Sequence, residues 1–142
     1  MRATTRRLAL GRNRKGAALA EMAAILPVFA LIIFGILEAS RMCMVSQLLA
    51  NAAREGCRVA VCKDRTLADV TTLVKAILSD SGITASTVTV TSNQTNLQHA
   101  GMRDPITLTV QVPFKDVNWL PTPFLYSSTT VRARATMRSE RP

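Results

Sequence analysis

Residues Ala17–Leu37 read AALAEMAAILPVFALIIFGIL, and Glu21 is the only charged residue among them. A helix rises 1.5 Å per residue, so this stretch is about 31 Å long, roughly the thickness of the hydrocarbon core of a bilayer. The stretch therefore predicts a transmembrane helix over residues 17–37. Pro27 lacks the N–H that would bond the carbonyl of Ala23, which predicts a kink at this point of the helix.

Positive charge is concentrated immediately before this apolar stretch. The chain has 142 residues, and its 18 lysines and arginines against 9 acidic residues give a formal charge of +9. Six of the basic residues fall within residues 1–16, which contain no acidic residue. By the positive-inside rule, we expect residues 1–16 to be a cytoplasmic leader and the chain beyond the helix to lie across the membrane. Because the charge is a topology signal and aromatic residues are only 4%, a nucleic-acid partner is not expected.

Three interpretations of the leader and the apolar stretch are open at this point. The first is a cleaved secretory signal, because Leu37-Glu38-Ala39 loosely resembles a small-residue cleavage site. The second is an uncleaved signal anchor, which would make the chain an envelope protein with an extracytoplasmic binding domain. The third takes Gly16 together with Glu21, because an ionisable side chain kept in an apolar helix usually has a partner.

The helical pattern continues beyond the apolar stretch and becomes amphipathic over residues 38–62. Apolar residues recur at helical spacing, which predicts that this part of the helix covers a small domain. The apolar positions are Met42, Val45, Leu48, Leu49, Ala52, Val59 and Ala60, and the polar ones are Arg41, Gln47, Asn51, Arg54, Glu55 and Arg58. Gly56 interrupts the pattern, either as a bend or as a point of close contact.

A second helix is predicted shortly after this one, at the start of an extracytoplasmic domain over residues 63–142. Thr66 is followed three residues later by Asp69, which is close to a capping box. An apolar stripe then runs from Leu67 to Leu78, and Gly82 ends it.

The rest of this domain alternates in the way that strands do. Apolar residues alternate with polar ones over Ser86–Ser92, Ile106–Phe114 and Thr129–Arg138. In the third strand the arginines fall on one face, at positions 132, 134 and 138, which favours a solvated sheet face over an anion-binding patch. The expected fold class is α+β, with a long transmembrane and amphipathic helix packed on one further helix and a three-stranded antiparallel sheet.

The residues that usually carry chemistry form no catalytic or metal-binding pattern, so we expect neither an enzyme nor a cofactor. His99 is the only histidine, and no cysteine or carboxylate cluster stands near it at metal-ligand spacing. The three cysteines are Cys43, Cys57 and Cys62. Cys57 and Cys62 could form a disulfide only if the helix breaks near residues 56–61. In a continuous helix their Cα atoms are further apart than the limit of about 7 Å for a disulfide.

Five segments along the helix together carry a resemblance to a known family. They are Lys15–Glu21 (KGAALAE), Leu26–Val28 (LPV), Gly35–Glu38 (GILE), Asn51–Gly56 (NAAREG) and Arg58–Val61 (RVAV). In this order and spacing the chain resembles the TadE-like family, pilin-like proteins of the tight-adherence (Flp) pilus assembly system. The NAAREG stretch is the most specific of the five. Two positions depart from the family pattern: Met22, where an aromatic residue is usual, and Cys57, where a small residue is usual.

The resemblance implies a processing step, a set of partners and a location. A prepilin peptidase would cut after Gly16, leaving Ala17 as the first residue and Glu21 as the fifth. The Glu21 carboxylate would then pair with the free α-amino group of a neighbouring subunit, which can fix axial register. The implied partners are the peptidase, other pilin or pseudopilin subunits, the Tad secretion machinery and the bacterial inner membrane. The implied role is in assembling or initiating an adhesive pilus.

Overall fold

The computed structural model describes residues 14–62, 64–84, 88–94, 97, 101, 103–119 and 128–139, and the side chains of residues 14 and 15 are not among those described. The chain divides into two compact units, Met1–Phe34 and Gly35–Pro142. The elements in order are α1 (Arg14–Ala60), α2 (Leu67–Asp80), β1 (Thr89–Ser92), β2 (Pro105–Pro113), the 3-10 helix η3 (Phe114–Asp116) and β3 (Thr130–Arg138). The α+β fold class predicted from the sequence is confirmed.

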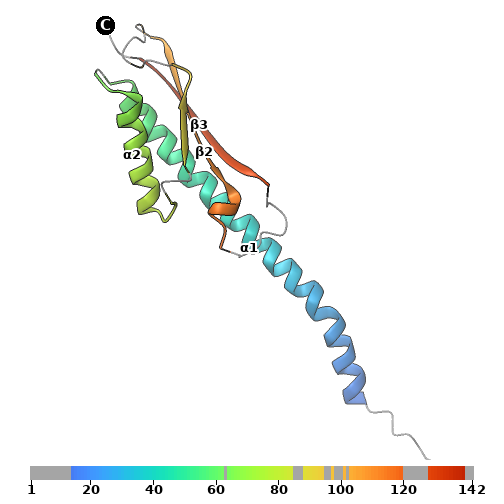
Figure 1. The fold of residues 1–142 in the computed structure, drawn as a ribbon. Coiled ribbons are helices and arrows are strands. Elements are labelled where there is room, and N and C mark those ends of the chain that lie inside the picture. Colours follow the sequence, from blue (N-terminus) through green and yellow to red (C-terminus); the bar gives the residue numbers. More distant parts are fainter. Residues whose placement is uncertain are drawn as a thin grey trace, which may run out of the picture. The chain divides into compact units, whose positions relative to one another are not determined.

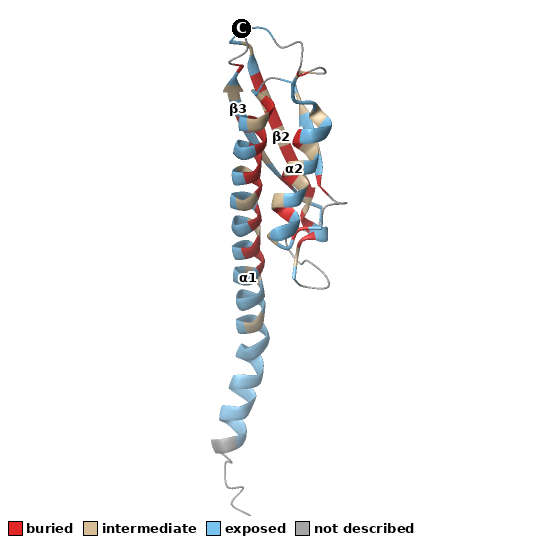
Figure 2. Cartoon of the chain, turned by 90° about the vertical axis from the view of Figure 1, so that its left-hand side faces the viewer, coloured by how far each residue is buried: buried red, intermediate tan, exposed pale blue. Residues whose placement is uncertain are grey.

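Helix α1 takes part in both units. Its residues before Gly35 belong to the first unit, where nearly every side chain that is described is exposed. Pro27 lies inside the helix, which continues on both sides of it. The residues from Gly35 onward belong to the second unit, and one face of this part is buried (Figure 2).

Helix α2 forms where the capping signal predicted it. The Thr66 hydroxyl accepts a hydrogen bond from the Asp69 backbone N–H at 3.3 Å, and the Asp69 carboxylate accepts one from the Thr66 backbone N–H at 3.0 Å. The helix is followed by Gly82, whose φ of +79° lies in the left-handed region that favours glycine. The capping box and the terminating glycine predicted from the sequence are therefore confirmed.

The three strands form one antiparallel sheet in the order β1-β2-β3 (Figure 1). Val90 lies opposite Val110, and Val110 lies opposite Ala133. Alternation along β2 buries every second residue, and β3 follows the same rule with its arginines outward. Phe114, expected at the end of a strand, instead begins η3, because the chain turns there and places its ring in the core.

The core of the second unit lies between α1, α2 and the sheet. It takes side chains from α1 at helical spacing, from one stripe of α2 and from the inner face of the strands. Its largest fully buried members include Leu49 of α1, Leu78 of α2, Leu108 of β2, and Phe114. The sheet alone has too few residues for a deep core, so the C-terminal part of α1 completes it.

Candidate functional site

The first unit presents an apolar helix with no packing partner among the described residues. Leu19, Met22, Ile25, Leu26 and Phe29 are each more than half exposed. By length and composition, α1 can cross a membrane, and none of its most apolar segment is buried. Such a surface is unfavourable in water and favourable in lipid, which agrees with the predicted transmembrane segment.

Gly16 and Ala17 lie in the first turns of α1, and Glu21 follows one turn later. A Cβ on Gly16 would meet no heavy atom within 4 Å. Packing against the described residues therefore gives no reason for a glycine at position 16. Glu21 is exposed, and no described residue forms a hydrogen bond or ion pair with it. The geometry leaves both positions open to another molecule.

The Asn51–Gly56 stretch separates into a packing face and a solvent face. Ala52, Ala53 and Gly56 are buried. Asn51, Arg54 and Glu55 are exposed, and the Arg54 guanidinium donates to the Asn51 side-chain oxygen at 2.8 Å. The small residues of this motif let α1 approach the domain closely, and the polar ones remain on its outer face.

At Gly56, helix α1 lies in close contact with both α2 and β2. A Cβ at this position would lie 2.6 Å from Val74 Cγ2 and 2.7 Å from Leu108 Cδ2. Both distances are too short for a carbon–carbon contact, so no larger residue fits without displacing a neighbour. Of the two interpretations left open by the sequence, close contact is the correct one, because α1 continues to Ala60 without a break.

Cys57 and Cys62 are not joined by a disulfide. Cys57 is fully buried, and its thiol donates to the Ile106 carbonyl oxygen at 3.3 Å. Burial raises the pKa of this thiol, although backbone N–H groups of Met137 and Leu108 partly oppose the effect. Cys62 is exposed just beyond the helix, and its thiol donates to the Arg58 carbonyl oxygen. The disulfide considered from the sequence is therefore not formed, because the helix break that it requires is not there.

Arg41 was placed on the polar face of α1 by the sequence pattern, and this was wrong. Its side chain is only 6% exposed, and its Nε donates to the Val117 carbonyl oxygen at 2.8 Å. Its guanidinium carbon lies 4.7 Å from the centroid of the Trp119 ring. Burial lowers the pKa of this guanidinium, although arginine remains protonated in proteins.

Glu38 is also buried, one turn before Arg41. The signal that would have placed both residues inward is the phase of the helix. Counting back from Leu49 and Val45 at steps of three and four reaches positions 41 and 38, where the charges of these residues concealed the buried stripe.

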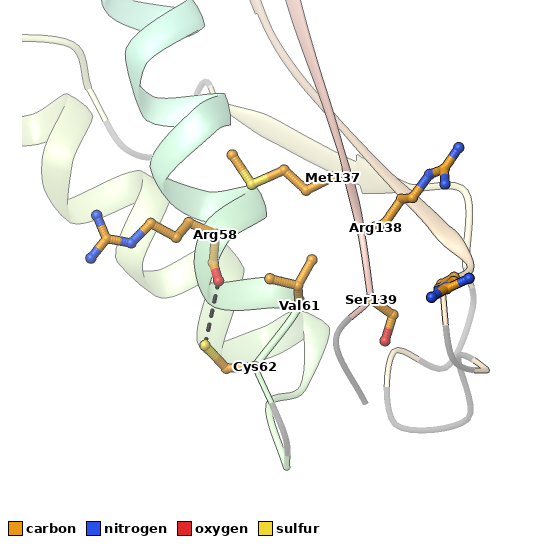
Figure 3. A pocket seen from close by; sticks show the side chains of 7 residues that line it. Arg58, Val61, Cys62, Met137, Arg138 and Ser139 are labelled. Carbon is orange, nitrogen blue, oxygen red and sulfur yellow. Dashed lines mark hydrogen bonds between the residues drawn. The ribbon is translucent and has the colours of Figure 1, made fainter. Parts of the chain in front are cut away.

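A cavity of about 810 Å³ opens where the end of α1 meets the end of β3 (Figure 3). Its lining residues are Arg58, Val61, Cys62, Arg103, Met137, Arg138 and Ser139. Figure 3 shows that the guanidinium groups of Arg58 and Arg138 extend away from each other, so they do not converge on one ligand. No carboxylate or histidine is among the described residues that line this cavity.

The described part of the chain contains no candidate metal site. No group of three histidine, cysteine, aspartate or glutamate side chains there is close enough to hold a metal ion. His99 lies outside the described residues.

The structure defines the class to which the chain belongs: an α+β domain built on the C-terminal part of a helix whose N-terminal part can cross a membrane. The family model described as TadE-like protein matches residues 16–58. The match begins at Gly16 and includes Glu21, Pro27 and the whole Asn51–Gly56 stretch, which confirms the resemblance seen in the sequence. No match was found among curated proteins or among solved structures.

Proposed function

We propose that the chain is a TadE-like pseudopilin or minor pilin that takes part in assembling or initiating a Flp/Tad-type pilus for adhesion. The observation that carries this proposal is the TadE-like match over residues 16–58, which begins at Gly16. The chain is then not an enzyme. It is the substrate of a prepilin peptidase and a partner of other pilin subunits and of the Tad secretion machinery.

The exposed glycine supports cleavage at the Gly16–Ala17 junction. Gly16 is open to a space without neighbours, so a peptidase can approach the backbone there. Residues 1–16 hold six positive charges and stay on the cytoplasmic side, while residues 38–142 lie on the other side of the inner membrane. Cleavage removes this leader after it has oriented the helix.

Glu21 is the residue that we assign to subunit assembly. It is exposed within an apolar helix segment, where a lone carboxylate is costly in lipid. The α-amino group of Ala17 from a neighbouring subunit supplies the missing positive charge after cleavage. Such a pair contributes little net stability, but it fixes how far one helix shifts along the next.

Mass spectrometry of the protein purified from its own cells tests the processing step. We expect an N-terminus at Ala17, and a Gly16→Ala variant should retain the leader. An N-terminus at Met1 would instead indicate a signal-anchored envelope protein with an extracytoplasmic binding domain. An N-terminus near Ser40 would indicate a secretory signal, and either result would contradict the proposal.

A further inference from the structure

Trp119 is the only tryptophan of the chain, and it is largely exposed. The residue is 67% exposed, although it follows a segment in which Phe114 and Val117 are buried. A single exposed aromatic side chain is common on a folded domain, so a contact surface is indicated only where apolar surface continues beside it. Trp119 belongs to the same compact unit as residues 35–60 of α1.

Arg41 holds this tryptophan against α1. The guanidinium carbon lies 4.7 Å from the ring centroid, within the range of a cation–π contact. The Nε–H of Arg41 is fixed by the Val117 carbonyl oxygen at 2.8 Å, and its Nη1 donates to the Met44 sulfur at 3.5 Å. Because Arg41 is itself buried, the ring is supported from the side of the helix and is open on the other.

The position of Trp119 along the axis of α1 indicates what covers its exposed side. The apolar stretch ends at Leu37, four residues before Arg41, which is about 6 Å along a helix. Ile36, Leu37 and Met44 are 60%, 44% and 45% exposed, so apolar surface continues on α1 across this level. Lys115, just before the loop that carries Trp119, is exposed and positively charged.

We propose that Trp119, positioned by Arg41, seats in the headgroup region of the bilayer that α1 crosses and holds the domain against the membrane surface. An indole ring combines an apolar body with a polar N–H, which is why tryptophan concentrates at this depth. The proposal rests on the membrane placement of α1 in the proposed function. Lipid covers the open side of the ring in this arrangement. Protection of Trp119 from both bromine and aqueous acrylamide would instead indicate a neighbouring subunit over the ring and would overturn the proposal.

The native fluorescence of Trp119 tests this directly in the full chain. The protein is reconstituted into phosphatidylcholine vesicles with bromine atoms near either the carbonyl end or the methyl end of the acyl chains. We expect bromine near the carbonyl end to remove about half of the emission, and bromine near the methyl end to remove much less, because the ring lies shallow. Unchanged emission in both kinds of vesicle, with full quenching by aqueous acrylamide, would overturn the proposal.

Two control variants replace Trp119 with phenylalanine and place a single tryptophan at another position. Phe29→Trp places the tryptophan inside the apolar stretch, and its emission should be quenched by bromine near the methyl end. Thr136→Trp places it on the outer face of β3, near Cys57, whose thiol approaches the Ala135 carbonyl oxygen. That position is 16 helical residues beyond Arg41, about 24 Å, so its emission should not respond to bromine.

The controls separate failure of this inference from failure of the proposed function. Quenching of the tryptophan at position 29 without quenching of Trp119 would leave α1 in the membrane and refute the anchor. A tryptophan at position 29 that bromine does not reach would contradict the membrane placement itself. An Arg41→Gln variant should make Trp119 more accessible to acrylamide in vesicles if Arg41 positions the ring, and unchanged accessibility would refute this role of Arg41.

Discussion

The Nε–H of Arg41 donates a 2.8 Å hydrogen bond to the carbonyl oxygen of Val117, which lies 76 positions further along the chain. Val117 is 5% exposed and follows η3 directly, so its carbonyl has little access to water. The bond joins α1, near the end of its apolar stretch, to the loop that carries Trp119. It therefore ties the beginning of the second unit to its middle.

We predict that an Arg41→Ala variant destabilises the second unit by about 2 kcal/mol, because a buried carbonyl loses a charged donor. Pulse proteolysis of the full chain in mild detergent at increasing urea concentrations measures this loss. Arg54→Ala is the matched control, because Arg54 is exposed and donates its hydrogen bond to Asn51 on the same helix. Equal urea midpoints for the two variants would contradict the assigned role of Arg41.

A second prediction concerns Gly56 and Gly16, two of the three glycines of α1. Gly56→Ala should lower stability by about 1 kcal/mol, because overpacking the contact with Val74 and Leu108 outweighs the gain in helix propensity. Gly56→Leu should lower it further. The same urea titration applies, and unchanged stability of the leucine variant would refute the close contact.

Gly16→Ala is the control for the Gly56 variants, and we expect it to affect processing but not stability. A Cβ at position 16 meets nothing within 4 Å, so the stability of the second unit should not change. Processing should fail instead, whereas Gly56→Ala should be processed normally. A Gly56→Ala variant that is folded but unprocessed would contradict the packing role of Gly56, because it would show that the Asn51–Gly56 stretch is needed for cleavage.

Much of this fold could be predicted because the signals that determine it involve residues close together in the sequence. The Thr66–Asp69 cap involves residues three apart, and the alternation along β2 reflects the two faces of one strand. Such features need no knowledge of distant segments, which is why they were predicted correctly.

The features that the sequence missed depend on contacts between distant segments. Arg41 was placed on the polar face by its charge, but Val117 and Trp119 together accommodate it in a buried position. Gly56 left a choice between a bend and a contact, and only the positions of Val74 and Leu108 decide it. The candidate functional residues follow the same rule. Gly16 and Glu21 could be identified from the sequence, whereas the contact between Arg41 and Trp119 could not.

A third prediction concerns Glu21. A Glu21→Gln variant should insert into the membrane as well as the native chain, because removing a charge from an apolar helix favours insertion. Its incorporation into pili, or the number of pili that cells form, should fall at least about tenfold if the charged pair sets axial register. Electron microscopy of sheared pili, with membrane fractionation of the same cells, measures both. Glu55→Gln, on the exposed face of α1, is the control, and equal piliation in the two variants would refute the pairing.

A fourth prediction is a pH dependence in the cap of α2. Hydrogen bonds from the backbone and side chain of Thr66 lower the pKa of the Asp69 carboxyl. A lowered folded-state pKa gives stability that is present above the unfolded value of about 3.9 and is lost as the pH falls through the folded value. In a Thr66→Ala variant, the stability that is lost below a pH of about 4 should be smaller than in the native chain. The cap itself should weaken by about 1 kcal/mol at neutral pH.

Hydrogen exchange of the first turn of α2 between neutral and acidic pH measures this effect. Thr72→Ala serves as the control, because Thr72 is exposed in the middle of the same helix and its hydroxyl bonds only the Ala68 carbonyl oxygen. That variant should keep the native dependence on pH. A Thr66→Ala variant with the native dependence would contradict the capping assignment.

The last prediction separates Cys57 from Cys62 by their reactivity. Cys57 is fully buried and its thiol pKa is raised, so both access and the thiolate fraction are reduced at neutral pH. Cys62 is exposed, so a short pulse of maleimide should label it at least about tenfold faster than Cys57 in the folded chain. Peptide mass spectrometry after the pulse measures both rates, and in urea the two should become equal. If neither thiol reacts until a reductant is added, the two residues are bonded to each other and α1 must break before residue 60.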